Sequence, residues 1–355
     1  MKTKFSLLMF VNALFILIIS CQDETGPQYY KYGWEKLQTV TDQNLNDITF
    51  SDSLTGWICG DNGTLLKSTD SGENWNSMLS TTESNLKKIQ FINSDMGFIL
   101  GEHNILKTTD RGDTWYAIFI KGEDSDLDDM QFIDENNGWI CSWHIYSTKD
   151  GGLTWYIISP QIDSLLLVYS SVYFINEIYG FASGYSVDTS KYIWKDIVIK
   201  TIDGGKNWQI IKENEKLSVK RFKKMMFSSP ELGFMINDWN EIYKTSDGGI
   251  SWYQPNNNIL SSYHDNGLYI GHLSKLILID SLNIALTGND RTYTDKYVGY
   301  ISRSTDGGNI WYPYQTGLYG KINSGYFKNT NIGWLVGDGG LILKTNNGGV
   351  YYYEK

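Results

Sequence analysis

The chain is poor in cysteine, proline, arginine and histidine. Three cysteines in 355 residues exclude a disulfide scaffold. Cys59 and Cys141 follow the same Gly-Trp-Ile context in two separate repeats and are expected to be buried free thiols. Beyond its first twenty residues the sequence shows no helical periodicity, which excludes a helical bundle. Aromatic residues at 15% and 35 glycines favour short strands connected by turns.

Positive charge is also scarce. The formal net charge is −10, so the surface repels phosphates and nucleic acid is not expected as a partner. The four histidines lack the close spacing of zinc ligands, so neither a metal site nor a cofactor is predicted. The four arginines, Arg111, Arg221, Arg291 and Arg303, lie in different repeats, which argues against an arginine cluster.

The sequence has no apolar run of the roughly 20 residues that a membrane-spanning helix needs. A shorter apolar run over residues 7–19 follows two lysines, so residues 1–20 are interpreted as a secretory signal peptide. Ser20 before Cys21 resembles the bacterial lipobox, which implies lipidation of Cys21 and a tether over residues 21–33. An ordinary signal peptide, or a buried Cys21, is the alternative. We expect export across the inner membrane and a lipid anchor at the outer membrane or cell surface, or on the periplasmic face.

The dominant feature is a nine-residue motif that occurs seven times. Its first copy, Lys67 to Trp75, reads KSTDSGENW, and in the seventh copy Asn347 replaces Asp. Successive copies are 40 to 59 residues apart, which predicts an array of similar supersecondary units. The Asp, Gly and Trp of the first six copies are Asp70, Gly72 and Trp75; Asp110, Gly112 and Trp115; Asp150, Gly152 and Trp155; Asp203, Gly205 and Trp208; Asp247, Gly249 and Trp252; and Asp306, Gly308 and Trp311.

Each residue type of the motif suits a hairpin turn. Asp can accept hydrogen bonds from backbone N–H groups of its own turn, and Gly permits the positive φ that the turn requires. Trp suits a half-buried site against a neighbouring sheet. The motif resembles the Asp-box, or BNR repeat, of sialidases, sortilin-like receptors and related β-propellers. An apolar triplet precedes five of the boxes and a Gly-aromatic pair precedes six, which gives four short strands per repeat.

These repeats predict an all-β fold, a single seven-bladed β-propeller of four-stranded blades over residues 34–355. Two segments, Val350–Tyr353 and Trp34–Leu37, can supply the outermost strand of the last blade, and the C-terminal one is favoured, with Trp34 beside it. The blades are expected at about residues 41–82, 83–123, 124–164, 165–215, 216–258, 259–318 and 319–355.

The pattern from Trp34 to Lys355 is similar to that of the Ycf48/HCF136 family of photosystem II assembly factors. The resemblance implies the seven-bladed fold. An arginine-rich patch is implied for photosynthetic members, and this chain has no counterpart to it, so the photosystem role is not carried across.

The boxes are expected on one rim of the propeller as scaffold, and ligand binding on the opposite rim, where the loops between the second and third strands lie. Aromatic side chains there suit a sugar ring or a peptide, or they cover their own loops. The candidate residues on this rim are His103, Trp143, His144, Tyr185, Trp194, Trp239, His264, Tyr293 and Tyr297.

Two charged segments have simpler interpretations. Residues 124–128 open like a calcium loop, but Asp129 stands where Gly is required, so a solvated acidic loop is favoured. The basic run of Lys216, Lys220, Arg221, Lys223 and Lys224 is interpreted as a solvated connection, with an acidic partner as the alternative.

We expect a monomeric, membrane-anchored binding or assembly module with a protein or carbohydrate partner and no catalytic residues. Two alternatives stay open. One is a glycan hydrolase of sialidase or xyloglucanase type, which would need two carboxylates about 5 to 9.5 Å apart across a cleft. The other is a Ycf48-like assembly factor for a membrane complex.

Overall fold

The structure is a computed structural model, and it describes residues 30–31, 33–122, 125–160, 165–188, 193–214, 222–255, 269–291, 296–350 and 352–353. The chain forms two units. In the smaller one, β1 (Tyr30–Lys31) pairs antiparallel with β29 (Tyr352–Tyr353). The larger unit covers Gly33–Val350 and carries the rest of the strands.

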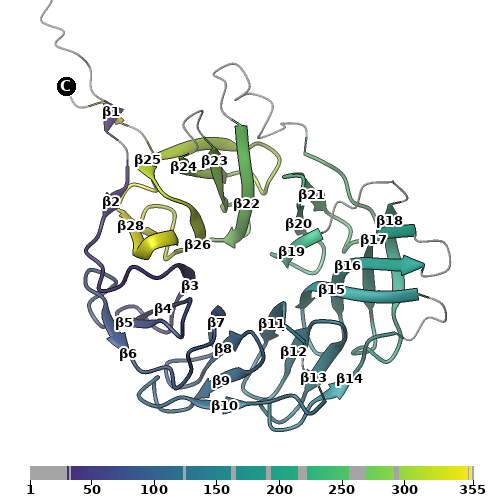
Figure 1. Cartoon of the computed structure of the whole chain (residues 1–355). Coiled ribbons are helices and arrows are strands. Elements are labelled where there is room, and N and C mark those ends of the chain that lie inside the picture. Colours follow the sequence, from purple (N-terminus) through teal and green to yellow (C-terminus); the bar gives the residue numbers. More distant parts are fainter. Residues whose placement is uncertain are drawn as a thin grey trace, which may run out of the picture. The chain divides into compact units, whose positions relative to one another are not determined.

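Seven antiparallel blades form a ring in the larger unit, which confirms the predicted seven-bladed propeller (Figure 1). The first strand of each blade lies innermost, at the central channel (Figure 1). In order, the blades are β3 (Leu45–Phe50), β4 (Gly56–Gly60), β5 (Leu65–Ser68) and β6 (Asn76–Met78); β7 (Leu86–Phe91), β8 (Gly97–Gly101), β9 (Ile105–Thr108) and β10 (Tyr116–Ile118); β11 (Asp129–Phe132), β12 (Gly138–Cys141), β13 (Ile145–Thr148) and β14 (Tyr156–Ile157); β15 (Leu165–Phe174), β16 (Gly180–Asp188), β17 (Ile193–Thr201) and β18 (Gln209–Asn214); β19 (Phe222–Phe227), β20 (Gly233–Asn237) and β21 (Ile242–Thr245); β22 (Tyr269–Leu278), β23 (Ile284–Arg291), β24 (Tyr297–Ser304) and β25 (Tyr312–Tyr319); and β26 (Ile322–Phe327), β27 (Gly333–Gly337), β28 (Leu341–Thr345) and β2 (Glu35–Lys36). The 3-10 turn η2 (Asp338–Gly340) connects β27 to β28.

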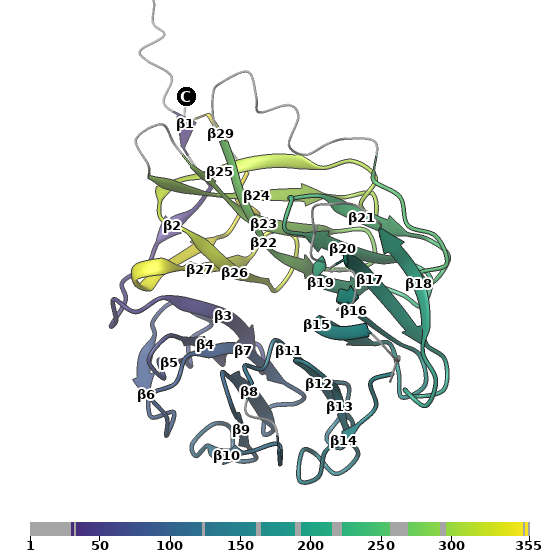
Figure 2. The ribbon, with the colours of Figure 1, turned by 45° about the vertical axis from the view of Figure 1, so that its right-hand side comes forward.

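The blades differ in size. Blades 4 (β15–β18) and 6 (β22–β25) have the longest strands, and both extend beyond their neighbours (Figure 2). In blade 5, among the described residues, the fourth strand is reduced to one bridge between Lys244 and Tyr253. None of the helices in the part of the chain that the structure describes has the length and apolarity that a membrane span needs.

The core is divided among the seven interfaces between neighbouring blades. One cluster, for example, joins Ile48 and Trp75 of blade 1 to Trp334 of blade 7. A blade is apolar on both faces, so it can bury them only between two neighbours, and closing the ring gives each blade both. Cys59 and Cys141 are buried free thiols in two such interfaces, as predicted.

The boxes fold as tight turns between the third and fourth strands. Asp70 Oδ1 accepts hydrogen bonds from Ser68 Oγ at 2.8 Å and from the backbone N–H of Asn74 at 3.0 Å. Ser68 Oγ in turn accepts the N–H of Gly72 at 2.9 Å. Gly72 has φ of +73°, and a Cβ there would lie 2.6 Å from the indole nitrogen of Trp334, so both conformation and space require glycine.

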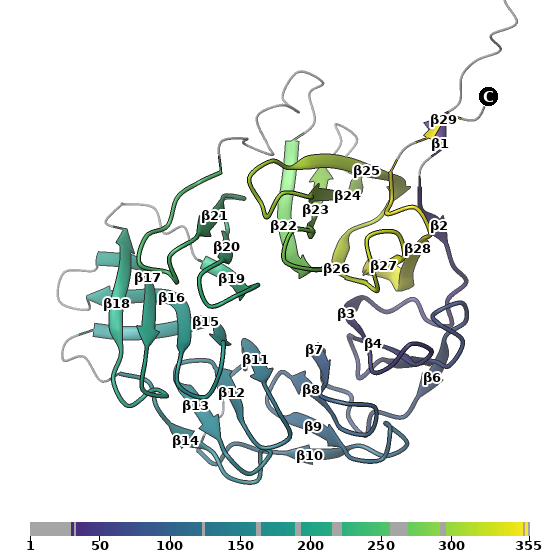
Figure 3. The same ribbon diagram turned by 180° about the vertical axis from the view of Figure 1, so that it is seen from behind.

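The prediction that the C-terminal segment completes the last blade is wrong. Its outermost strand is β2, in which Glu35 pairs with Lys344 and Lys36 with Leu343. Figures 1 and 3 view the ring from opposite faces, and both show β2 beside β28. Tyr352 and Tyr353 pair with β1 instead. The chain start thus closes the ring against its end, which removes an exposed strand edge.

Candidate binding rim and central channel

The box rim is occupied by contacts between neighbouring blades. In boxes that open with a basic residue, this residue reaches the box of the next blade: Lys67 Nζ donates to the carbonyl of Arg111 at 3.0 Å, and Lys107 Nζ to that of Gly151 at 2.8 Å. Arg303 contacts Gly348 in the same way, at 2.9 Å. Each of these cations also lies over an aromatic ring of its own or the next blade. These side chains hold the ring together.

The opposite rim carries the predicted candidate residues that the structure describes. His103, Trp143, His144 and Trp239 lie in loops between the second and third strands of blades 2, 3 and 5. Tyr185, Trp194 and Tyr297 lie in the strands of the long hairpins of blades 4 and 6. His264, Tyr293 and Cys21 lie outside the described residues.

Three tryptophans on this rim are exposed. The exposed fractions are 51% for Trp143, 40% for Trp194 and 52% for Trp239. They belong to blades 3, 4 and 5, which are consecutive in the ring (Figure 1). Trp194 packs on Tyr185 with ring centroids 5.3 Å apart, so this hairpin has a local aromatic pair. The three indoles give one sector of the rim an apolar, hydrogen-bonding surface.

The described histidines do not converge on a metal ion. His103 Nδ1 lies 3.6 Å from Asp126 Oδ1, and His144 Nδ1 lies 3.3 Å from Ser159 Oγ. Among the described residues, no group of three or more His, Cys, Asp or Glu side chains has the arrangement of a metal site.

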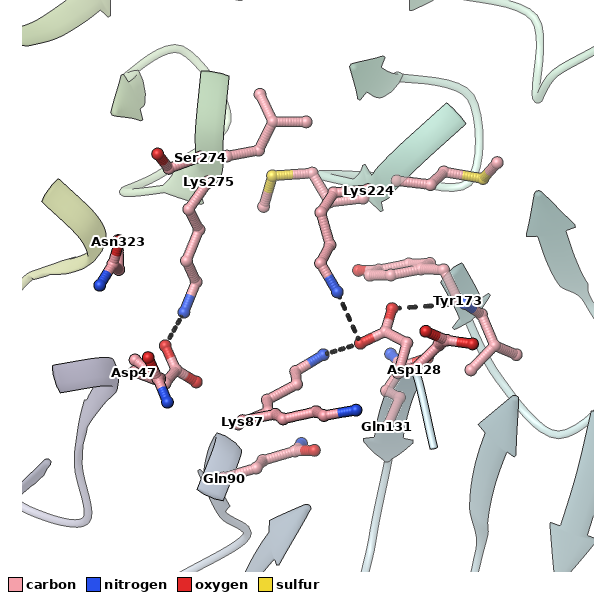
Figure 4. Close-up of a pocket in the computed structure, with 17 residues that line it drawn as sticks. Asp47, Lys87, Gln90, Asp128, Gln131, Tyr173, Lys224, Ser274, Lys275 and Asn323 are labelled. Atoms are coloured by element: carbon pink, nitrogen blue, oxygen red, sulfur yellow. Dashed lines mark hydrogen bonds and ion pairs between the residues drawn. The ribbon is translucent and has the colours of Figure 1, made fainter. Parts of the chain in front are cut away.

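A cavity of about 360 Å³ lies in the central channel and is lined by all seven inner strands. Figure 4 shows side chains from separate blades pointing into it, among them Lys87, Asp128, Lys224 and Lys275. A shift of register near the start of the inner strand explains this arrangement. In blade 1, Leu45 pairs with Gly60 and Asp47 with Cys59, so Asn46 is an extra residue in the strand.

Such a β-bulge re-aims side chains that would otherwise alternate between the two faces. The same shift occurs in blades 2, 4, 5, 6 and 7. In blades 1, 2, 5 and 7 the bulge lies at the start of the inner strand, which is the end nearest the rim opposite the boxes. In the longer strands β15 and β22 the bulges at Ser170 and Ser274 lie near the middle. The cavity therefore belongs to the same rim as the exposed tryptophans.

Asp47 is a buried carboxylate that connects four blades. It pairs with Lys275 of blade 6, accepts Ser324 Oγ of blade 7 at 2.6 Å, and accepts the N–H of Ile89 of blade 2 at 3.1 Å. Burial raises its pKa, but Lys275 and these hydrogen bonds outweigh burial and hold the pKa below its usual range.

Asp129 of blade 3 is a second buried carboxylate, and it connects its own blade to blades 2, 4 and 5. Its Oδ1 lies 2.8 Å from Lys88 Nζ of blade 2 and 3.4 Å from Lys224 Nζ of blade 5. Its Oδ2 accepts Ser171 Oγ of blade 4 at 2.8 Å. Burial raises its pKa, but Lys224 and Lys88 outweigh burial and hold the pKa well below the usual range.

Asp128 differs from both. It opens to the channel, and no ion pair within 4 Å is recorded for it among the described residues. The side chain of Asp128 is exposed, and the partial loss of hydration inside the channel raises its pKa despite the attraction of Lys87 and Lys224. Lys87 Nζ donates to the carbonyl of Leu127 at 2.9 Å.

Two features bear on the hydrolase alternative. Glycoside hydrolysis needs a carboxyl group that donates a proton. Asp47 and Asp129 are held ionised by lysines, so of the carboxyl groups that line the cavity only Asp128, whose pKa is raised, suits that role. Of the arginines, Arg111 pairs with Asp95 at 2.8 Å and Arg303 is buried in a box strand, so both serve the box rim. An arginine triad of the sialidase kind cannot include either of them.

The polar lining of the channel was not predicted from the sequence. Lys223 and Lys224 were expected in a solvated connection, which is wrong, because they lie in the inner strand β19. The acidic loop was expected over residues 124–128, and the described residues 125–128 lie outside the strands. Asp129, which follows this loop and was assigned no role, is buried in β11. The signal lay in aligning the apolar triplets: the residue before each triplet is Asp47, Lys88, Asp129, Ser171, Lys224, Lys275 or Ser324. A polar residue at one fixed position of every inner strand indicates a ring around the axis.

Comparisons with known proteins agree with this architecture. The model of the family described as "Photosynthesis system II assembly factor YCF48" matches residues 26–123 and 109–315, well over half of the chain. No curated protein matches the chain.

Solved structures with a similar fold were also found. One, "YCF48 bound to D1 peptide", is 18% identical with a TM-score of 0.63 and covers 90% of this chain and 99% of that one. YCF48 from Cyanidioschyzon merolae is 17% identical with a TM-score of 0.65, covering 88% and 99%. The xyloglucanase of Xanthomonas campestris is 10% identical with a TM-score of 0.63, covering 90% of this chain but 54% of that enzyme. At these identities the similarity shows the fold alone.

Proposed function

The chain belongs to the family of YCF48 photosystem II assembly factors, and on this premise we propose that it is a non-catalytic assembly module that holds a segment of a partner protein. The binding surface is the rim opposite the Asp-boxes, in the sector of blades 3 to 5. The chain acts there as a monomer.

The observation that carries this proposal is the exposure of Trp143, Trp194 and Trp239 on one rim of three consecutive blades. Tryptophan is enriched at the energetic centres of protein interfaces, because it buries a large area with little loss of side-chain entropy. The YCF48 structure in complex with a D1 peptide supports a peptide segment as the ligand class. We do not propose D1 as the partner of this chain. Its four arginines lie in different repeats and give no counterpart to the arginine-rich patch of the photosynthetic members.

An array of peptides from the membrane proteins of the same cell tests the proposal. The full-length chain in non-ionic detergent should bind a subset of peptides, and Trp143→Ala or Trp239→Ala should weaken binding at least tenfold. Tyr312→Ala is the matched control, because Tyr312 is 51% exposed on the outer strand β25, away from the rim loops. Equal loss in the control, or binding to a glycan array in place of peptides, would reject the proposal.

The anchor is part of the same proposal and rests on the sequence around Cys21. A diacylated cysteine would hold the module at the membrane that carries its partner, since two acyl chains give stable anchoring. Cys21→Ser should move the protein from the membrane fraction to the soluble fraction and abolish metabolic labelling with palmitate. If Cys21→Ser stays membrane-bound and labelled, the anchor is elsewhere.

A further inference from the structure

The charges around the channel cavity do not balance. Four ammonium groups, those of Lys87, Lys88, Lys224 and Lys275, face three carboxylates, those of Asp47, Asp128 and Asp129. The cavity therefore carries a net positive charge within a chain whose net charge is −10. Low-dielectric walls focus such a field, so an anion is drawn to this point of the molecule.

The two halves of the cavity differ. Lys275 is matched by Asp47 and also donates to Ser324 Oγ at 3.0 Å. On the other side, Lys88 and Lys224 share one oxygen of Asp129, at 2.8 and 3.4 Å. An ammonium group has three N–H donors, so one shared carboxylate oxygen leaves donors of both lysines directed at the cavity.

Lys87 adds a third ammonium group to this side. The acceptor recorded for it is a neutral carbonyl, that of Leu127. Figure 4 shows Lys87 and Lys224 reaching toward the part of the cavity where Asp128 lies. The side chains of Lys88 and Lys224 are 31% and 37% exposed, so an incoming ion can reach them.

From this geometry we propose that the channel binds a small divalent oxyanion between Lys87, Lys88 and Lys224. Its oxygens accept hydrogen bonds from the three ammonium groups. Its negative charge offsets the positive charge that remains on these three lysines after Asp129 neutralises one of them. A cavity of about 360 Å³ holds a small molecule and lies at the lower end of the range for ligand sites. Inorganic phosphate and a four-carbon dicarboxylate both present this chemistry. The site is separate from the tryptophans and does not depend on the proposed partner binding.

The charge of Asp128 provides a test of whether the ligand is negatively charged. It is the one cavity carboxylate without a recorded ion pair in the described part of the chain, and it lies close enough to Lys87 and Lys224 for their charges to act on it. An anion must approach it, so its negative charge opposes binding. Replacing it by the isosteric amide removes that repulsion and leaves the lysines in place.

Isothermal titration calorimetry of the full-length chain at low salt and pH 7, with sodium phosphate and with sodium succinate, tests the proposal. At least one of the two should bind saturably with one site per chain. Lys224→Met should weaken that binding at least tenfold, and Asp128→Asn should strengthen it several-fold. Lys223→Met is the matched control with unchanged affinity, because Lys223 pairs with Asp238 at 2.9 Å and does not line the cavity.

The two probes distinguish the ligand class, since binding of phosphate alone or of succinate alone identifies it. Lys87→Met provides a second cavity variant if Lys224→Met does not fold, which the near-ultraviolet circular dichroism of the buried tryptophans reports. The proposal fails if the wild type binds neither probe, if Lys223→Met loses as much affinity as the cavity variants, or if Asp128→Asn binds more weakly.

Discussion

The ring of Trp34 stands edge-on to the ring of Phe327, with centroids 6.1 Å apart and planes at 84°. Five of the six box tryptophans meet the last aromatic residue of their inner strands in the same way, for example Trp75 with Phe50 at 6.1 Å and 77°. The last box has Tyr352 where the others have Trp. The chain start therefore supplies the missing tryptophan together with the strand that closes the ring.

Trp34→Ala should destabilise the propeller by about 3–5 kcal/mol, since it leaves a cavity in the interface between blades 6 and 7, where Trp34 is buried. Trp143→Ala is the control and should change the free energy of unfolding by less than about 0.5 kcal/mol, because Trp143 is exposed. Urea denaturation followed by far-ultraviolet circular dichroism measures both. If Trp34→Ala changes the free energy of unfolding as little as Trp143→Ala does, the ring closes without a contribution from Trp34.

Asp129→Asn should destabilise the ring by about 2–4 kcal/mol, because the lysines beside it lose their counter-charge. The pKa of Asp129 is lower in the folded state than the roughly 3.9 of an unfolded Asp. A group with a depressed folded pKa stabilises above the unfolded pKa, and this contribution is lost as pH falls below about 4. The difference between wild type and variant should thus shrink from pH 6 to pH 3 in urea denaturation. A difference that is constant with pH would contradict this role for the charge.

Asp70→Ala should destabilise blade 1 by about 1 kcal/mol, comparable to the loss of a helix cap. Hydrogen bonds from the backbone and side chain of Asn74 lower the pKa of Asp70 to about 2, so the carboxylate stays ionised in ordinary buffers. Asp70→Asn should cost less, since Asn347 fills the same place in the last box and accepts Thr345 Oγ1 at 3.0 Å. Thermal unfolding compares the two. If peptide binding falls instead, the box rim is a binding site.

Cys59 and Cys141 should resist thiol reagents in the folded protein. Burial raises the pKa of both thiols, and the thiolate is the reactive form. In the Cys21→Ser chain, Ellman's reagent at pH 8 should label neither thiol until urea unfolds the ring, and then both. A raised folded pKa also predicts that stability falls as pH rises above about 8.5. Rapid labelling of the native chain would contradict the observed burial.

The fold could be predicted from the sequence because its signals are local. Each box, such as Asp70 with Gly72, specifies its own turn through hydrogen bonds within a few residues, and seven such turns determine the blade count. Closure by β2 could not be predicted in the same way. Two residues, Glu35 and Lys36, make the strand, and so short a segment carries no periodic pattern.

The exposed rim could be predicted in part. Loop positions follow from the order of strands, so Trp143 and Trp239 can be assigned to this rim from the sequence alone. The channel was missed because its contacts join distant parts of the chain: Lys275 and Asp47 are 228 residues apart. Lys224 also stands in a basic run that is typical of a solvated segment, and only the bulged inner strand turns it to the axis.

Asp47 bonds to blades 2, 6 and 7 from its own blade, and Asp129 to blades 2, 4 and 5 from its own, so these two side chains span the whole ring. Asp47 of blade 1 reaches Lys275 of blade 6, and Asp129 of blade 3 reaches Lys224 of blade 5, so each pair skips a blade. The axial ion pairs thus couple blades that the box contacts, which join adjacent blades alone, do not connect, and loosening one blade should be felt two blades away.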